Sequence, residues 1–251
     1  MIKNLINIED LTVDDINQIC THANEFEKGI RKSNHSNAHV MNMFFENSTR
    51  TKMSFEMAEN RLHINKYDFQ EGISSIQKGE NLFDTINNLS AIGINAFIIR
   101  HTGNALIEEL SKNKYFGEVS FINAGSGTKS HPTQALLDFY TIRKHCLNLS
   151  EKTITIVGDI AHSRVAHSNI ALLKKFGMKI RCLAPDYLTG EKIEGVEYFT
   201  SIKEAFEGSE IIMALRIQRE RIQEHINIDE YIKNYQITKD NLPYDALLMH
   251  P

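Results

Sequence analysis

The chain has 251 residues, a formal net charge of -4 at pH 7, and 28 basic and 32 acidic residues that are spread along its length. No basic stripe of the kind that follows nucleic-acid phosphates is present, which excludes nucleic acid as an expected partner. Cys20, Cys146 and Cys182 lack metal-binding spacing, so we expect reduced, buried thiols. Because no apolar run reaches membrane-spanning length and the N-terminus lacks a signal-peptide core, we expect a cytoplasmic protein that does not bind membranes.

In the first half of the chain, apolar runs of strand length alternate with segments of helical periodicity. Thr12-Val13-Asp14-Asp15 resembles a capping box and predicts that a helix starts at Thr12. Strands are predicted at residues 39–45, 96–100 and 118–124, and helices at residues 51–62, 81–92 and 105–112.

The second half repeats this alternation after a predicted connecting helix at residues 131–145. Strands are predicted at residues 153–157, 179–183, 211–215 and 247–249, and a helix at residues 164–176. The polar stretch 148–152 is the predicted boundary, so we expect an α/β protein with two doubly wound parallel-sheet domains, residues 1–147 and 148–251. Ligands of such sheets lie beyond the carboxyl ends of the strands.

Ser48-Thr49-Arg50-Thr51 stands where a predicted buried strand runs directly into a helix. Ser48 or Thr49 could serve simply as an N-cap, but capping alone does not need Arg50. Hydroxyl groups and a guanidinium beside the free N–H groups of a helix N-terminus form a ready phosphate site. We therefore favour phosphate binding here.

A second polar cluster, residues 125–134, also lies between a predicted strand and a helix. It is similar to a P-loop at first sight, but Thr128 stands where that motif requires glycine, so we reject an NTPase. His131 and Gln134 remain, one helical turn apart, where both could face one ligand. A lone histidine is usually structural, yet strand-to-helix junctions often line clefts.

In the second half, Gly158-Asp159 follows a predicted strand, but the GxGxxG fingerprint is absent, so a nicotinamide cofactor is unsupported. We interpret that turn as packing geometry. Arg164 and the arginines of residues 215–221 stand at helix and strand ends, where a ligand carboxylate could be held. Taken singly, each is more typical of a surface ion pair, and the polar loop 74–80 is by composition a solvated linker.

Taken together, five elements resemble the ordered motif set of aspartate carbamoyltransferases. They are Ser48-Thr49-Arg50-Thr51, Arg100-His101, His131-Pro132-Thr133-Gln134, Arg164 and Arg216-Ile217-Gln218-Arg219-Glu220-Arg221. The first element is shared with ornithine carbamoyltransferases, whereas the Arg-Ile-Gln segment and the absence of a His-Cys-Leu-Pro element favour aspartate as the acceptor.

The resemblance implies a role for each matching residue, without metal or cofactor. Ser48, Thr49, Arg50 and Thr51 would hold the phosphate of carbamoyl phosphate with Arg100, while His131 and Gln134 contact the carbamoyl group. Arg50, Thr51, Arg100 and His131 would be the catalytic residues. Arg164, Arg216 and Gln218, with Lys78, would bind L-aspartate.

The resemblance also implies an assembly and a length. Ser74 and Lys78 would reach into a neighbouring subunit's site, so a homotrimer with shared active sites is expected, and any regulatory chain would be a separate polypeptide. Members of the family continue beyond Pro251 into a loop and a final helix, so this chain is expected to be truncated. Two alternatives remain open: an inactive paralogue that binds phosphate ligands or assembles with other chains, and an ornithine carbamoyltransferase.

Overall fold

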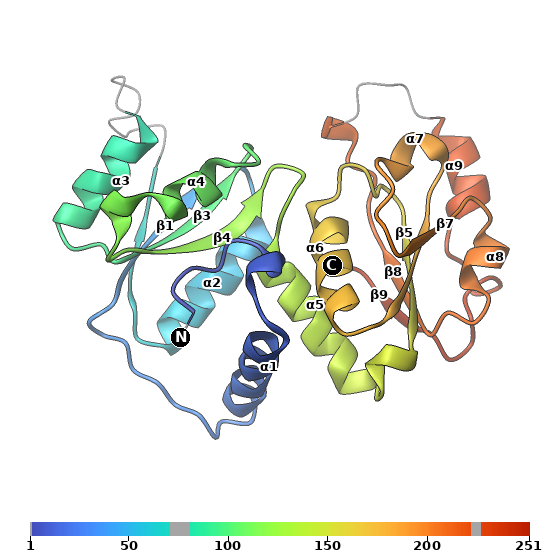
Figure 1. Ribbon diagram of the computed structural model, residues 1–251, viewed down its shortest axis with the longest axis horizontal. Coiled ribbons are helices and arrows are strands. Elements are labelled where there is room, and N and C mark those ends of the chain that lie inside the picture. Colours follow the sequence, from blue (N-terminus) through green and yellow to red (C-terminus); the bar gives the residue numbers. More distant parts are fainter. Residues whose placement is uncertain (1, 71–80, 222–226) are drawn as a thin grey trace. The chain divides into compact units, whose positions relative to one another are not determined.

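The computed structural model describes residues 2–70, 81–221 and 227–251. The chain folds into two compact units, Met1–Thr133 and Gln134–Pro251, each of which contains one parallel sheet (Figure 1). The α/β prediction with two doubly wound parallel sheets is confirmed. The domain limits 1–147 and 148–251 stay a prediction. In the part of the chain that the structure describes, no helix combines the length and apolarity needed to cross a membrane.

The first unit contains a four-stranded parallel sheet in the order β2-β1-β3-β4. Its strands are β1 (His39–Phe44), β2 (Asn65–Asp68), β3 (Ala96–His101) and β4 (Ser120–Ser126), and its helices are α1 (Val13–Glu27), α2 (Thr49–Arg61), α3 (Leu82–Ala91) and α4 (Leu106–Lys112). The predicted capping box starts α1, where the Asp15 N–H donates to Thr12 Oγ1 over 3.1 Å. The sequence analysis missed β2, because this short edge strand is mostly polar.

The sheet of the first unit is covered on both faces. Met41, Met43 and Phe97 belong to a core cluster with residues of α3 and α4. The alternate strand positions, Val40 and Ile98, belong to a second cluster that includes Phe55 of α2. Strands that are buried on both faces consist mostly of apolar residues, which is why β1 and β3 could be predicted from the sequence.

The second unit contains a five-stranded parallel sheet in the order β7-β6-β5-β8-β9. Its strands are β5 (Thr153–Val157), β6 (Lys179–Leu183), β7 (Val196–Phe199), β8 (Ile211–Ala214) and β9 (Leu247–Met249). Its helices are α5 (Pro132–His145), which begins just before the unit, α6 (Arg164–Lys175), α7 (Asp186–Thr189), α8 (Ile202–Phe206) and α9 (Ile228–Tyr235). The edge strand β7 and the helices α7 to α9 were not predicted.

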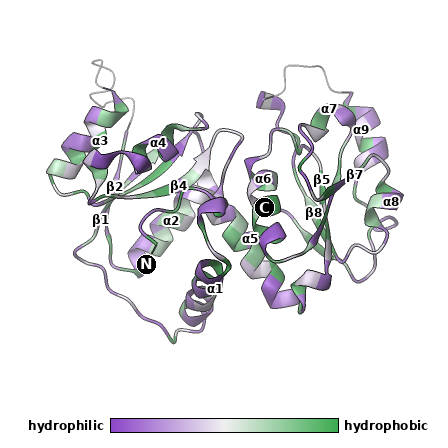
Figure 2. Cartoon of the chain, viewed as in Figure 1, coloured by the Kyte–Doolittle hydropathy of each residue, from purple (hydrophilic) through white to green (hydrophobic). Residues whose placement is uncertain are grey.

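Helices α8 and α9 each carry both apolar and polar residues, as the two colours along them show (Figure 2). Val157 and Ile212 pack in one cluster with residues of α8 and α9, so this face of the sheet is covered by those helices. The thiols of Cys20 and Cys182 are free and buried as expected, but Cys146 is only partly buried, which corrects the prediction for that residue. Burial raises the pKa of the Cys182 thiol to about 12.

Both sheets reverse their winding direction at one place. In the first unit the chain passes from β1 to β2 and then crosses to β3 on the other side of β1. In the second it passes from β5 through β6 to β7 and then crosses to β8 on the other side of β5. Ligands of open α/β sheets bind at the carboxyl ends of the strands that flank such a switch point. The expected ligand positions are therefore the ends of β1 and β3, and of β5 and β8.

Gly158 lies in the turn after β5, at the second switch point, and its backbone φ of 127° lies in the region that favours glycine. An added Cβ would lie 2.8 Å from the Leu215 carbonyl oxygen, across the ends of β5 and β8. We expect Gly158→Ala to lower the free energy of unfolding by about 2 to 4 kcal/mol, measured by urea denaturation. Gly208→Ala is the control, since Gly208 also has a positive φ but nothing lies within 4 Å of its added Cβ. Equal losses of unfolding free energy in the two variants would show that the contact with the Leu215 carbonyl oxygen is not the cause.

Candidate active site

The N-terminus of α2 is the first candidate ligand site, at the carboxyl end of β1. Its N-cap, Ser48, is extended (φ -158°, ψ 102°) and makes no side-chain capping bond, and no acidic residue stands in the first turn. The N-caps of α1, α3 and α6, by contrast, each accept a backbone N–H. The side chains of Thr49 and Arg50 are exposed beside this helix end. The first-turn N–H groups, the helix dipole and the guanidinium together suit an anion.

Arg100 is held at the carboxyl end of the neighbouring strand β3. Its Nη1 donates to the Ala124 carbonyl oxygen over 3.1 Å, and its Nε lies 3.4 Å from Oε2 of Glu46. The Arg100 and Glu46 side chains are only 13% and 17% exposed. The Phe45 N–H donates to the Arg100 carbonyl oxygen over 2.9 Å, which joins the end of β1 to β3. The structure therefore brings the Ser48–Thr51 segment and Arg100 to the same edge of the sheet.

The loop after β4 is a tight turn whose N–H groups already donate hydrogen bonds to other groups of the protein. The Gly127 N–H donates to the His101 carbonyl oxygen over 2.9 Å, and the Thr128 N–H donates to Asn104 Oδ1 over 2.9 Å. The Ser126 N–H bonds the Ser130 carbonyl oxygen over 2.8 Å and closes the loop. A phosphate cradle needs such N–H groups for its ligand, so the geometry agrees with the rejection of a P-loop.

His131 follows this loop, and Gln134 lies in the first turn of α5. His131 is buried, with 5% of its surface exposed, and its Nδ1 lies 3.4 Å from Thr133 Oγ1. Gln134 Nε2 donates to Oδ1 of Asp138 over 2.9 Å, and Asn169 Nδ2 of α6 donates to Oδ2 of the same carboxylate over 2.8 Å. Burial raises the pKa of the Asp138 carboxyl to about 6, although the hydrogen bonds from Asn169 and Gln134 oppose part of the increase.

This raised pKa makes the stability of the protein depend on pH. The ordinary pKa of an aspartate is 3.8, so the folded chain binds the Asp138 proton more tightly than the unfolded chain does. Stability from this group is therefore greatest in acid and is lost as the pH rises to about 7, by about 2 to 3 kcal/mol. Urea titrations of the wild type and of Asp138→Asn would measure this effect. We expect the difference between their unfolding free energies, wild type minus variant, to fall by about 2 to 3 kcal/mol between about pH 4 and pH 7. A difference that does not change with pH would contradict the prediction.

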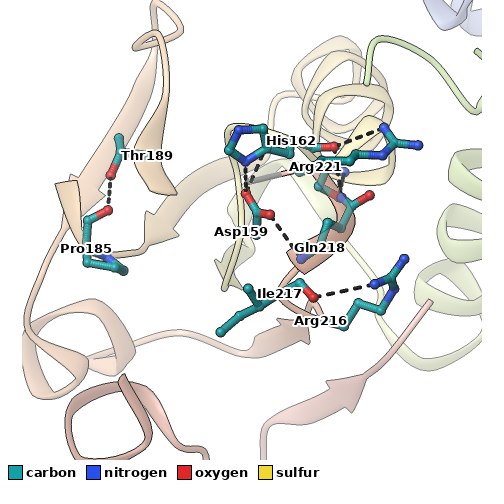
Figure 3. Close-up of polar contacts among 10 residues, drawn as sticks. Asp159, His162, Pro185, Thr189, Arg216, Ile217, Gln218 and Arg221 are labelled. Carbon is teal, nitrogen blue, oxygen red and sulfur yellow. Dashed lines mark hydrogen bonds and ion pairs between the residues drawn. The ribbon is translucent and has the colours of Figure 1, made fainter. Parts of the chain in front are cut away.

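In the second unit, polar groups gather around Asp159, which directly follows β5 and Gly158 (Figure 3). The Asp159 side chain is fully buried, and its Oδ1 accepts from the His162 N–H over 3.1 Å and lies 2.8 Å from His162 Nδ1. Its Oδ2 accepts from the Gln218 N–H over 3.2 Å. Gln218 Nε2 in turn donates to the His162 carbonyl oxygen over 2.8 Å. These bonds tie the segment after β8 to the turn after β5.

Three arginines lie in the segments that follow β5 and β8. Arg164 begins α6 and is buried, with 6% of its surface exposed. Arg216 and Arg221 belong to the segment after β8, where Arg216 Nη1 bonds the Ile217 carbonyl oxygen over 3.4 Å and Arg221 Nη1 bonds the His162 carbonyl oxygen over 3.5 Å (Figure 3). A cluster of cations at the carboxyl ends of β5 and β8 suits a ligand with carboxylate groups.

Asp159 and His162 are the candidate residues that the sequence analysis missed. The interpretation of Gly158-Asp159 as packing geometry left out one usable signal, a carboxylate that one residue separates from a strand made only of β-branched residues. Ser74 and Lys78, predicted to act across a subunit interface, lie outside the described residues. Among residues 2–70, 81–221 and 227–251, no group of three or more His, Cys, Asp or Glu side chains is placed to hold a metal ion.

Comparison with known proteins gives one consistent family. Residues 3–144 match the model of the aspartate/ornithine carbamoyltransferase carbamoyl-P binding domain, and residues 150–251 match that of the Asp/Orn binding domain. A relative from Wolbachia sp. subsp. Drosophila simulans, an aspartate carbamoyltransferase catalytic subunit, is 41% identical over 257 residues, which cover 99% of this chain and 85% of the relative. The protein of that name from Staphylococcus carnosus is 38% identical and is covered to 82%, with 99% of this chain aligned.

A solved structure has the same fold. Aspartate transcarbamoylase from Trypanosoma cruzi, in complex with carbamoyl aspartate and phosphate, superposes with a TM-score of 0.87 at 27% identity. The match covers 99% of this chain and 84% of that one. The two family models together span both units, and their order is the order of the two candidate ligand positions. The chain therefore belongs to the aspartate/ornithine carbamoyltransferase family.

Proposed function

We propose that this chain transfers the carbamoyl group of carbamoyl phosphate to the amine of L-aspartate, giving N-carbamoyl-L-aspartate and phosphate. In a cell this reaction would serve pyrimidine synthesis, and we place it in the cytoplasm. The observation that carries the proposal is the pair of switch points, one with an anion-binding helix end and one with clustered arginines. The names of the relatives support the same reaction.

Carbamoyl phosphate would bind with its phosphate group in the first unit. Its phosphate would accept hydrogen bonds from Ser48, Thr49, Arg50 and Thr51 at the start of α2, with Arg100 beside them. A helix N-terminus favours this anion because its N–H groups point outward and its dipole is positive there. The fixed position of Arg100, bonded to Ala124 and paired with Glu46, means that little reorganisation is needed when the ligand binds.

The reaction needs an electrophilic carbonyl carbon and a stabilised leaving group. The neutral amine of aspartate attacks the carbamoyl carbon, and negative charge builds on the carbonyl oxygen, to which Thr51, Arg100 and His131 would donate. The bond from carbon to the phosphate oxygen then breaks, and phosphate leaves with the electron pair. The phosphate itself would take the amine proton, since the motif set offers no evident general base. Positioning and electrostatics would supply the rate increase.

L-Aspartate would bind through Arg164, Arg216 and Gln218 in the second unit. An acceptor with two carboxylates matches several guanidinium groups, whereas ornithine has one carboxylate and an α-ammonium group that they would repel. Asp159 is not available to bind the ammonium group of ornithine, because its side chain is fully buried and both of its carboxylate oxygens already accept hydrogen bonds, from His162 and Gln218. The charge distribution of the second unit therefore favours aspartate over ornithine.

Calorimetric titration with carbamoyl phosphate, followed by turnover assays with aspartate and with ornithine on the same sample, tests the proposal. We expect binding of carbamoyl phosphate and product formation with aspartate only. Product formation with ornithine but not with aspartate would show that ornithine is the acceptor. Binding without turnover would favour an inactive paralogue, and folded protein that binds no carbamoyl phosphate would overturn the proposal.

We further propose a homotrimer in which Ser74 and Lys78 complete the site of a neighbouring subunit. Mixing Arg50→Ala chains with Lys78→Ala chains tests this sharing, because a mixed oligomer would regain some sites that carry neither substitution. Regained activity supports shared sites. Absence of activity despite confirmed mixing counts against them. Any regulatory chain would be a separate polypeptide and would appear as a second species bound to the oligomer.

A further inference from the structure

The family resemblance implies that Gln134 contacts the carbamoyl group, but it leaves unexplained the buried carboxylate to which Gln134 is bonded. Asp138 lies one turn further along α5 and has only 4% of its surface exposed. Both of its oxygens accept amide N–H groups, from Gln134 over 2.9 Å and from Asn169 over 2.8 Å. Burial of a carboxylate is unfavourable unless its oxygens are hydrogen-bonded, so these two bonds hold the group in a defined orientation.

The carboxylate is anchored from a second helix. Asn169 Nδ2, which bonds Asp138 Oδ2, also donates to the Val165 carbonyl oxygen within α6 over 3.0 Å. Asn169 is itself fully buried. Asp138 therefore cannot turn toward or away from Gln134 without breaking a bond to α6, and it presents Oδ1 to Gln134 as a fixed acceptor.

A fixed acceptor determines which end of a glutamine amide is available to a ligand. The amide of Gln134 has a donor, Nε2, and an acceptor, Oε1, at similar distances from its chain. An ionised carboxylate can only accept, so the Nε2 end turns to Asp138 and the Oε1 end remains for other groups. A carbamoyl group carries an NH2 donor, which needs such an acceptor. The methyl group of acetyl phosphate carries no donor.

We propose that Asp138 is a positioning residue that orients the Gln134 amide, so that Oε1 accepts from the carbamoyl NH2 and the site selects carbamoyl phosphate over acetyl phosphate. This inference rests on the proposed function. Asp138 touches no substrate and acts through Gln134. Without it, the Gln134 amide can rotate and present either end, and the carbamoyl NH2 loses a defined partner.

Calorimetric dissociation constants for carbamoyl phosphate, acetyl phosphate and inorganic phosphate test the inference. In Asp138→Ala we expect the preference for carbamoyl over acetyl phosphate to fall about five- to tenfold, as the loss of one net hydrogen bond predicts. The dissociation constant for inorganic phosphate should stay within about twofold of the wild-type value, because phosphate would bind only at the α2 end of the site. Asp138→Asn keeps the shape of the side chain and serves where the alanine variant does not fold.

Two controls separate positioning from a general loss of structure. Asn169→Ala removes the anchor of Asp138 on α6 but leaves Oδ1 able to accept from Gln134, so it should lower the melting temperature and reduce the preference by less than Asp138→Ala does. In a double-mutant cycle, Gln134→Leu should abolish the preference, and adding Asp138→Ala should change it no further. A preference retained in Asp138→Ala and Asp138→Asn, or losses that add in the cycle, would overturn this inference alone. A wild type with no preference for carbamoyl over acetyl phosphate would overturn it together with the proposed function.

Discussion

Arg50→Ala is expected to lower turnover at least about 100-fold and to weaken carbamoyl phosphate binding by about 10- to 100-fold. Arg50 is exposed in the first turn of α2, at a helix end that has no acidic residue and no side-chain cap. Its guanidinium would neutralise the charge of the leaving phosphate, and charge-assisted bonds of this kind are about twice as strong as neutral ones. Steady-state kinetics together with calorimetric titration would measure both effects.

Lys52→Ala is the matched control for Arg50, since both residues are cations in the same turn of α2. Lys52 Nζ is already paired with Asp68 at 3.1 Å and with Glu56 at 3.9 Å, and its side chain is 38% exposed. Exposed pairs of this kind contribute little, so turnover should stay within about threefold of the wild type. If Arg50→Ala bound carbamoyl phosphate as tightly as Lys52→Ala does, the phosphate assignment for the α2 N-terminus would fail.

Asp159→Ala should lower kcat/KM for aspartate by about 100-fold, mostly through KM. The fully buried carboxylate accepts the N–H groups of His162 and Gln218, and its loss leaves donors unpaired at about 1 to 3 kcal/mol each. The segment with Arg216 and Gln218 would then lose its attachment to the turn after β5. Carbamoyl phosphate affinity should stay within about threefold, because the proposed phosphate residues belong to the other unit.

Thr155→Val controls for the loss of a buried polar group in the same strand. Thr155 is fully buried in β5, and its hydroxyl bonds the Ala205 carbonyl oxygen over 2.8 Å and Ser209 Oγ over 2.6 Å, on the side of α8. This variant should lose stability in urea but keep the KM for aspartate. Equal KM values in Asp159→Ala and Thr155→Val would show that Asp159 supports the fold and not the aspartate site.

The features that the sequence predicted well are local in the chain. The junction from β1 into α2 contains its strand, its N-cap and Arg50 within a short stretch, so the anion site proposed there rests on residues 44–56 alone and stays a prediction. The apolar runs of β1, β3 and β5 were predicted for the same reason. The edge strands β2 and β7 were missed, because one sheet edge provides too little burial to leave a continuous apolar pattern.

The features that were not predicted from the sequence are hydrogen bonds between residues that are far apart in the chain. Asp159 and Gln218 are 59 positions apart and meet only because β8 pairs with β5. Asp138 and Asn169 belong to different helices and meet only because these helices pack together. The roles proposed for Ser48 to Thr51, Arg100, His131, Arg164, Arg216 and Gln218 came from the resemblance and stay predictions. The structure adds hydrogen-bond partners for the side chains of Arg100, Arg216 and Gln218.

The sequence by itself determined the fold class, the strand-to-helix junctions and the types of side chain at each of them, because strand burial and helix capping depend on neighbouring residues. Only the tertiary structure decided which junctions lie side by side, since strand order is set by long-range pairing that local patterns do not encode. That order places the ends of β1 and β3 together, and those of β5 and β8 together, and so brings separate polar turns into two candidate ligand positions.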